Sequence, residues 1–281
     1  MIEMLGRLSD HLGFPVVSSS HGQEIDYMNG WVHWLMLILF IGWGIFFIYT
    51  LFKFRSSVNP KANYKGVTSH YSQYVEYGII FFEAFLLFGF AYPMWAKMKT
   101  NIPDVDQNTV VVRIIAQQFA WNVHYPGADG KFGVTTPEMV DEEINPIGLD
   151  RNSPNGADDI TTINQLHLPV DKQIMIYLSS KDVIHSLSFP EMRVKQDAIP
   201  GMTIPVFFTP TMTTEEFLNE IKGTAREGMG YEISCAQLCG NSHYRMRGYM
   251  TVHEEEGFEN WLTVQAEEIE EEGDDWGDDD W

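Results

Sequence analysis

Two long apolar stretches constrain this chain more than any other feature. Residues 28–52 contain no Asp, Glu, Lys or Arg, and residues 77–96 contain only one such residue, Glu83. A helix needs about 20 apolar residues to cross the ~30 Å hydrocarbon core of a membrane. Tryptophan and tyrosine residues lie near the ends of both stretches, as membrane–water interfaces favour. We therefore predict membrane-spanning helices over residues 27–54 and 75–98, rather than two buried helices of a soluble core.

The segment between the two stretches predicts their orientation. Residues 53–65 read KFRSSVNPKANYK, with four basic residues and no acidic one. Short loops rich in Lys and Arg usually stay in the cytoplasm, so we expect residues 55–74 to form a cytoplasmic loop. The N-terminal segment 1–26 and the chain from residue 99 onward then lie on the opposite, exported side. The opening residues are too polar for a secretory signal peptide, so the first span is expected to direct membrane insertion.

From residue 99 onward the sequence favours β-structure. Short runs rich in β-branched and aromatic residues alternate with segments that contain Gly and Pro, which is typical of an all-β sandwich or barrel. We predict this domain over residues 99–266, with a polar surface insertion at about residues 126–159 to which we assign no chemistry. The predicted strands lie within residues 109–125, 173–180, 183–189, 204–209, 230–235 and 248–253.

The charge of the chain limits its partners. A net charge of −21 argues against a nucleic-acid partner, because binding nucleic acid requires a basic surface. Residues 267–281 hold ten carboxylates and no basic residue. Such a segment buries too little apolar surface to fold alone. We predict an acidic disordered tail, which is either inert or a docking surface for a basic partner.

Both cysteines of the chain lie in one short segment, CAQLCGNSHYRMRG, which begins at Cys235. Cys239, His243 and Met246 follow in the same segment, and His185 in VIHSLSF is a candidate partner from another strand. Thiolate and thioether ligands favour copper, and imidazole suits copper or zinc. A copper electron-transfer site is therefore the best chemical interpretation of this segment.

The residues alone leave several arrangements open. A single blue-copper site needs one thiolate, whereas two bridging thiolates with one histidine per metal would hold two coppers. A zinc site of this type needs a fourth Cys or His and has no use for Met246. Cys235 and Cys239 could instead form a local disulfide, which an exported domain permits, and His243 could be a surface histidine.

The pattern C-x-x-x-C-x-x-x-H-x-x-M, preceded by the two apolar stretches and by VIHS and VKQDAIPG, resembles subunit II of the haem–copper cytochrome c oxidases. The resemblance implies a two-helix transmembrane hairpin followed by an all-β cupredoxin-like sandwich domain. It also implies that this domain holds a dinuclear copper centre, CuA. The implied copper ligands are the bridging thiolates of Cys235 and Cys239, the imidazoles of His185 and His243, the thioether of Met246 and the backbone carbonyl of Gln237.

Gln237 is a departure from the family pattern. The family commonly has Glu at this position, with its carboxylate near a magnesium ion shared with subunit I. An amide oxygen carries no formal charge and is a poorer ligand for this hard cation. The departure counts against magnesium binding through this chain, but it leaves the backbone carbonyl available to copper.

The aromatic residues through which the family accepts electrons also differ. The family sequence HQWYW corresponds to QQFAW here, so Phe119 occupies the position of the usual tryptophan, and Trp121 keeps the second one. Alternate residues of a strand share one face, so Trp121 is a second candidate for electron uptake. The alternative is that both are core aromatics.

The resemblance also implies roles for charged residues outside the copper segment. Glu76, at the cytoplasmic start of the second span, matches a glutamate near a proton pathway into subunit I. The helix macrodipole alone also favours a carboxylate at that position. Lys195 and Asp197 match positions near the subunit I interface. Glu83 lies deeper in the span, where a charge is usually functional or paired between helices.

The implied function is a one-electron relay. Cytochrome c, soluble or tethered, would supply electrons to CuA, and haem in subunit I would receive them for oxygen reduction coupled to proton pumping. The implied partners are subunit I, other oxidase subunits and membrane lipid. The long insertion and acidic tail favour a bacterial plasma membrane, with the N-terminus and the sandwich on the periplasmic side.

Three alternative interpretations assign the chain to other classes of protein. A membrane-anchored copper chaperone would have one span and the motif C-x-x-x-C-P, whereas Gly240 follows Cys239 here. A quinol oxidase subunit would lack the two thiolates. A structural zinc or disulfide module would hold no copper.

Overall fold

The computed structural model describes residues 13–61, 64–66 and 68–275. The chain divides into two compact units, a helical one that reaches Asn101 and a β-rich one that begins at Ile102 and includes the short segment Pro15–Gly22. The predicted N-terminal segment and the predicted acidic tail each lie partly outside the described residues.

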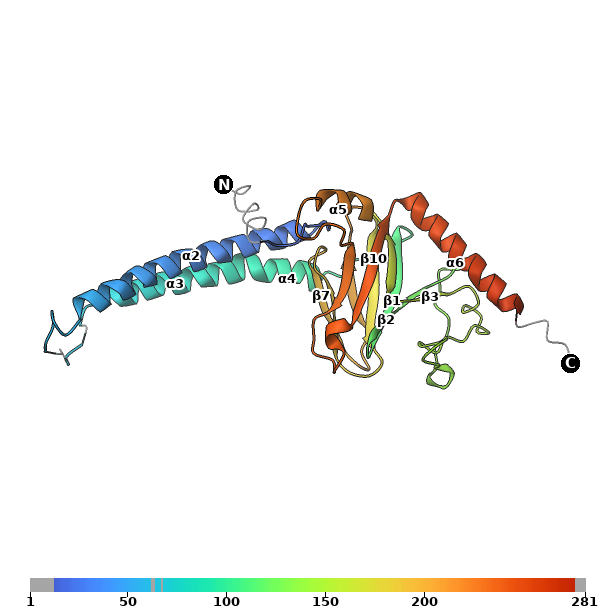
Figure 1. The fold of residues 1–281 in the computed structure, drawn as a ribbon, viewed down its shortest axis with the longest axis horizontal. Coiled ribbons are helices and arrows are strands. Elements are labelled where there is room, and N and C mark those ends of the chain that lie inside the picture. The colour runs from blue at the N-terminus through green and yellow to red at the C-terminus, as the bar shows by residue number, and fades with distance from the viewer. Residues whose placement is uncertain (1–12, 62–63, 67, 276–281) are drawn as a thin grey trace. The chain divides into compact units, whose positions relative to one another are not determined.

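The helical unit contains two long helical runs (Figure 1). Both are long and apolar enough to cross a membrane, and most of their large apolar side chains are exposed within the unit. An ion pair of 2.8 Å joins Glu24, near the start of the first run, to Lys97, near the end of the second, so the two runs are antiparallel. The runs consist of α2 (Gly22–Lys53) and of α3 (Tyr71–Leu86), the π-helical η1 (Leu87–Ala91) and α4 (Tyr92–Lys99).

The helices confirm the predicted hairpin but begin earlier than the spans predicted over residues 27–54 and 75–98. The additional first turns are polar, with Glu24 in α2 and Gln73 in α3. Helical hydrogen bonding can continue beyond the hydrocarbon core into the interfacial region, so the apolar stretch gives the minimum length of each helix. Both acidic residues singled out from the sequence, Glu76 and Glu83, lie in α3 and are exposed within this unit.

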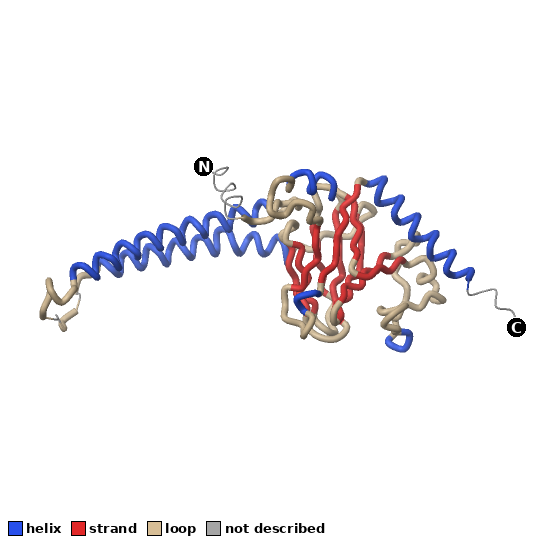
Figure 2. The backbone as a smooth tube through the Cα atoms, viewed as in Figure 1, coloured by secondary structure: helices blue, strands red, loops and turns tan. Residues whose placement is uncertain are grey.

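The β-rich unit is a sandwich of two five-stranded sheets (Figure 2). The strand orders are β3-β2-β1-β5-β8 and β4-β10-β9-β6-β7. β1 pairs with β5, and β4 with β10, in parallel, whereas the other pairs are antiparallel. The architecture confirms the predicted all-β, cupredoxin-like sandwich. The strands are β1 (Thr109–Gln117), β2 (Ala120–Tyr125), β3 (Ile160–Ile163), β4 (Gln165–Pro169), β5 (Gln173–Ser180), β6 (His185–Phe189), β7 (Val194–Ala198), β8 (Ile204–Phe208), β9 (Tyr231–Cys235) and β10 (Arg247–His253).

The hydrophobic core lies between the two sheets. In β1, Val112, Ile114 and Ala116 are fully buried, whereas the residues between them are only partly buried. This alternation is expected when one face of a strand covers a core. Leu166 in β4 and Phe189 in β6 contribute fully buried side chains from the opposite sheet. Burial of side chains of this size contributes about 1.5–3 kcal/mol each, so the core fixes the strand ends from which the loops emerge.

The structure divides the single strand predicted over residues 109–125 into the antiparallel pair β1 and β2, in which Gln117 is opposite Ala120. The tight connection contains neither Gly nor Pro, so the usual turn signals are missing. Three short strands were also not predicted: β3, β4 and β7. β7 is a polar strand at the edge of its sheet, and its side-chain pattern alone did not distinguish it from a turn.

The predicted disordered tail is wrong over residues 267–275, because helix α6 covers Glu255–Asp275. Phe258, Trp261, Leu262 and Ile269 pack this helix against the core. These apolar residues recur at helical spacing on one face, and glutamate is a good helix former. The acidic segment therefore continues a helix that is anchored upstream, and it does not need to bury apolar surface of its own.

Candidate metal centre

The predicted metal ligands come from two neighbouring strands and from the loop that follows one of them, which we call the metal-binding loop (residues 236–246). β9 ends at Cys235, β6 begins at His185, and the two strands pair so that Leu187 is opposite Cys235. The loop between Cys235 and β10 contains the remaining predicted ligands, with His243 in a short 3-10 turn, η3 (His243–Arg245). A backbone hydrogen bond of 2.9 Å from Ala236 N to Ser186 O ties the loop to β6.

The two sulfur atoms form the middle of the cluster. Cys235 Sγ lies 3.7 Å from Cys239 Sγ. Each sulfur faces one imidazole: Cys235 Sγ lies 4.0 Å from His185 Nδ1, and Cys239 Sγ lies 3.5 Å from His243 Nδ1. The sulfur–sulfur distance excludes a disulfide, whose bond is about 2.05 Å long, and both cysteines are free thiols.

Two weaker donors complete the cluster, one beside each sulfur. Met246 Sδ lies 3.7 Å from Cys239 Sγ, and the backbone oxygen of Gln237 lies 3.2 Å from Cys235 Sγ. Every residue that the resemblance implies as a copper ligand thus lies at one place in the structure. The donor set of two thiols, two imidazoles, one thioether and one carbonyl fits copper, because soft sulfur ligands select this metal.

The cluster is largely shielded from solvent. His185, Cys239 and Met246 are buried, whereas Cys235 and His243 are partly buried. Gln237 is exposed, and only its backbone is directed into the cluster. Burial of these donors limits the access of water to a bound metal.

The two thiols differ in acidity. Burial raises the pKa of Cys235, but hydrogen bonds from His185 and from backbone groups outweigh burial and lower this pKa to about 6. Burial and the adjacent Cys235 raise the pKa of Cys239 to about 11. Metal ligands must be deprotonated, so both thiolates coexist at neutral pH only when a cation shares the site.

Asp182 orients the buried histidine. Its Oδ1 accepts a hydrogen bond of 2.8 Å from His185 Nε2, which leaves Nδ1 for the metal. The backbone N–H groups of Gln118 and Val183 donate to the same carboxylate at 2.7 and 2.6 Å. Although burial raises the pKa of Asp182, these hydrogen bonds outweigh burial and lower it. Sequence reasoning missed this residue, and its position three residues before His185 is the signal that could have indicated it.

Gln118 connects the β1–β2 turn to the metal-binding loop. Its Nε2 donates a hydrogen bond of 2.6 Å to the backbone oxygen of Cys239. The next residue in the loop, Gly240, has a φ of 142° and lies so close to Gln118 and Phe119 that a Cβ there would be 2.7 and 3.0 Å from their side chains. Nothing in the sequence pattern predicted this role of Gln118, because it depends on the unpredicted turn.

The two aromatic candidates for electron uptake occupy different environments. Trp121, in β2, is fully buried, and its ring centroid lies 6.3 Å from that of His185. Phe119 is partly buried in the β1–β2 turn, against Gly240. The expectation that both lie on one face of a single strand is wrong, because the chain reverses between β1 and β2.

The remaining charged residues do not join the cluster. Lys195 and Asp197 lie on β7, next to the strand that carries His185, and both are exposed. Asp197 accepts a hydrogen bond of 2.7 Å from Ser186 Oγ. Glu76 belongs to the helical unit.

Comparisons with known proteins indicate the family of this chain. The family model described as cytochrome c oxidase subunit II, periplasmic domain, matches residues 110–252. The alternative cytochrome c oxidase subunit 2 of Bradyrhizobium diazoefficiens is 31% identical, over 93% of this chain and 88% of its own length. The heme-copper oxidase subunit 2 of Aeropyrum pernix is 26% identical, over 82% of this chain and 88% of its own length. The crystal structure of the periplasmic domain of subunit II of cytochrome oxidase from Bradyrhizobium japonicum matches with a TM-score of 0.39 and 24% identity, over 60% of this chain and 99% of that one.

Proposed function

This chain belongs to the cytochrome c oxidase subunit II family, and we propose that its two apolar helices anchor it in a membrane and that it carries a dinuclear copper centre that relays single electrons. One observation carries the proposal: two thiol sulfurs lie 3.7 Å apart, and each faces its own imidazole nitrogen. A mononuclear site would use only one of the two thiols. The proposed ligands are Cys235, Cys239, His185, His243, Met246 and the backbone carbonyl of Gln237.

The side chains of the site hold its geometry fixed. Asp182 keeps His185 in one tautomer, and Gln118 holds the carbonyl of Cys239. A copper pair held by Cys235 and Cys239 would supply one-electron redox chemistry at this site. Because the ligands are attached to β-strands and to a loop tied to them by hydrogen bonds, little rearrangement of the protein accompanies electron transfer.

The proposed partners follow from the family and from charge. We expect the electrons to come from cytochrome c and to pass to haem in subunit I, where oxygen is reduced and protons are pumped. The acidic character of the chain, with a net charge of −21, would steer a basic cytochrome toward it. We place the β-rich unit on the periplasmic side of a bacterial plasma membrane, because the basic loop between the helices favours the cytoplasm.

Two roles outside the copper cluster stay part of the proposal. Phe119 lies against Gly240 and Trp121 packs edge-on against the ring of His185, so both remain candidates for electron uptake. Glu76, exposed in α3, remains the candidate for proton uptake into subunit I.

Copper content and electron paramagnetic resonance of the full chain in detergent would test the copper centre. We expect two coppers per chain and one unpaired spin shared equally by both nuclei. Cys239→Ser should remove this shared signal, because it removes one bridge. Ser234→Ala, beside the cluster in β9, is the matched control and should retain the signal.

Other outcomes would contradict the proposal. One copper with its spin on a single nucleus would indicate a mononuclear site. Preferential retention of zinc would favour a structural metal module. Membership of the subunit II family argues against the alternative of a copper chaperone.

A further inference from the structure

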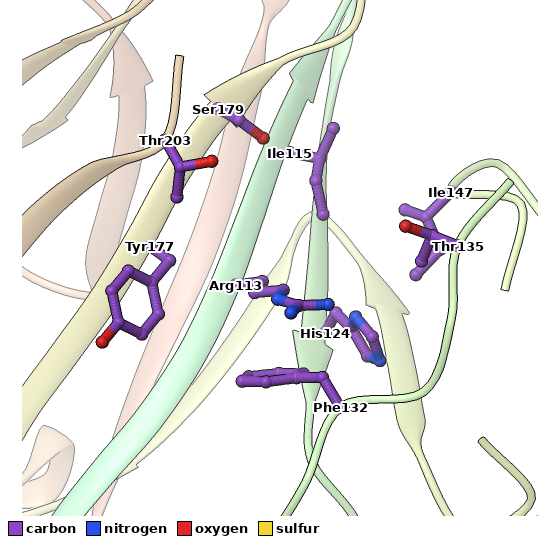
Figure 3. A pocket seen from close by; sticks show the side chains of 9 residues that line it. All are labelled: Arg113, Ile115, His124, Phe132, Thr135, Ile147, Tyr177, Ser179 and Thr203. Carbon is purple, nitrogen blue, oxygen red and sulfur yellow. The ribbon is translucent and has the colours of Figure 1, made fainter. Parts of the chain in front are cut away.

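A cavity of about 570 Å³ lies on the outer face of the sheet that contains β1, β2 and β5 (Figure 3). Arg113 and Ile115 project into it from β1 and alternate with the core residues of that strand, so they occupy the opposite face. Phe132 and Ile147, from the insertion, cover the cavity from the other side. Sites for small organic molecules typically have volumes of about 300–1,000 Å³, so this cavity has the size of a ligand site.

Arg113 supplies the cation that lines this cavity. Its guanidinium carbon lies 4.0 Å from the centre of the Phe132 ring. Within the described part of the chain its guanidinium group makes no side-chain hydrogen bond or close ion pair, although its charge is attracted by the carboxylate of Asp159. A guanidinium group offers five donors in a planar fork that matches a carboxylate or phosphate. Stacking on the ring holds this fork in place, ready to bind an anion.

His124 supplies a second, independent indication of a ligand. Its side chain is fully buried, and Nε2 lies 2.6 Å from Asp159 Oδ2. Asp159 is itself held by the backbone N–H groups of Gly133 and Gly127, at 2.7 and 3.2 Å. The other ring nitrogen, Nδ1, is buried and has no hydrogen-bond partner among the described residues. A buried polar atom without a partner costs about 1–3 kcal/mol, a cost that a bound hydroxyl group would remove.

The two polar groups define the chemistry of the ligand. Because Asp159 engages Nε2, Nδ1 is the nitrogen left to accept a hydrogen bond from a ligand hydroxyl, while Arg113 binds a carboxylate. Ile115, Ile147 and the Phe132 ring offer apolar contacts to the body of the molecule. We propose that this cavity binds a small organic monocarboxylate that carries a hydroxyl group.

Binding of three probes to the full chain in detergent, measured by titration calorimetry, would test this site. The probes are mandelate, phenylacetate, which lacks only the hydroxyl, and inorganic phosphate. We expect mandelate to bind, and phenylacetate to bind about tenfold more weakly, because it leaves His124 without a partner. Arg113→Gln should weaken mandelate binding by at least about tenfold, since it removes the charge-assisted hydrogen bonds. Arg247→Gln, an exposed arginine on the other sheet, should leave binding unchanged.

A second variant separates loss of the site from loss of the fold. Ser179→Phe fills the cavity from β5 without removing Arg113, and it should abolish binding while the thermal midpoint stays near that of the wild type. Absence of mandelate binding at millimolar concentrations, equal binding of mandelate and phenylacetate, preference for phosphate, or binding that persists in Arg113→Gln would each overturn the proposal. The readout is binding alone, so it does not depend on the copper centre.

Discussion

His185 Nε2 donates a hydrogen bond to Asp182 Oδ1 at 2.8 Å, while Nδ1 of the same ring faces the sulfur of Cys235 at 4.0 Å. One nitrogen of the imidazole is therefore engaged by Asp182, and the other is left for the copper that we propose. A carboxylate behind a metal-binding histidine fixes its tautomer and raises its basicity. Asp182 is in turn fixed by the backbone of Gln118, so the β1–β2 turn helps to position the histidine.

Asp182→Asn tests this relationship. The amide retains one oxygen to accept from His185, but its NH2 group would face the backbone N–H of Gln118, which now donates to the carboxylate. We expect copper affinity to fall by about 10–100-fold, the usual effect of losing such a partner. Competition with a copper chelator would measure it. Asp104→Asn, at an exposed position, should have no effect, and equal affinity of the two variants would contradict this role of Asp182.

Gly240→Ala tests the contact between the metal-binding loop and the β1–β2 turn. An added Cβ would lie 2.7 Å from Gln118 Nε2 and 3.0 Å from Phe119, at a φ of 142° that side chains rarely adopt. We expect a loss of about 1–3 kcal/mol in stability and fewer coppers per chain, because the hydrogen bond from Gln118 to the carbonyl of Cys239 would be displaced.

The matched control for this substitution is Gly230→Ala, where no atom lies within 4 Å of the added Cβ. Its stability should stay within about 0.5 kcal/mol of the wild type. Thermal unfolding would measure the stability of both variants, and metal analysis would measure their copper content. Full copper retention in Gly240→Ala would show that the contact is not needed.

Gln237→Glu tests the departure at the magnesium position. Only the backbone oxygen of Gln237 is directed toward Cys235, and the side chain is exposed. We expect the copper signal to be unchanged, and the assembled oxidase to retain Mn²⁺, a spectroscopic substitute for Mg²⁺, more tightly because a carboxylate is a better ligand for hard cations. Gln165→Glu, at an exposed position of β4, is the control. A changed copper signal would argue against a backbone-only role for residue 237.

The cluster of candidate metal ligands could be predicted from the sequence because these residues are chemically distinctive and closely spaced. Cys235, Cys239, His243 and Met246 lie on one short loop, and only His185 comes from elsewhere. The supporting residues could not be predicted in the same way. Asp182 and Gln118 act through a turn that lacks Gly and Pro, and side-chain pattern alone cannot place such a turn.

The limits of sequence patterns also explain where the predicted fold differs from the structure. The acidic segment after residue 266 has the composition of a disordered tail, yet it continues a helix that Phe258 and Trp261 anchor to the core. The insertion at residues 126–159 is mostly polar, and its sequence predicted no chemistry. Only the fold brings its Phe132 beside Arg113 of β1.

The histidine pair beneath α6 predicts a stability that depends on pH. His167 Nδ1 lies 2.8 Å from His253 Nε2, and the His167 ring stacks on Trp261 with centroids 4.2 Å apart. Burial, and then the nearby His253, lower the pKa of His167 from 6.5 to about 4. Because the unfolded chain binds the proton more readily, stability is complete above pH ~6.5 and is lost as the pH falls toward ~4.

His167→Gln should remove this part of the acid sensitivity. His167 is only partly buried, so we expect an effect on the order of 1–2 kcal/mol after screening by solvent. Thermal unfolding of the full chain at pH 7 and pH 5 should show a smaller decrease in the midpoint for the variant than for the wild type. His70→Gln, an exposed residue before α3, should behave as the wild type does. If both variants lose as much stability as the wild type on acidification, the histidine pair does not contribute, and the carboxylates alone account for the acid sensitivity.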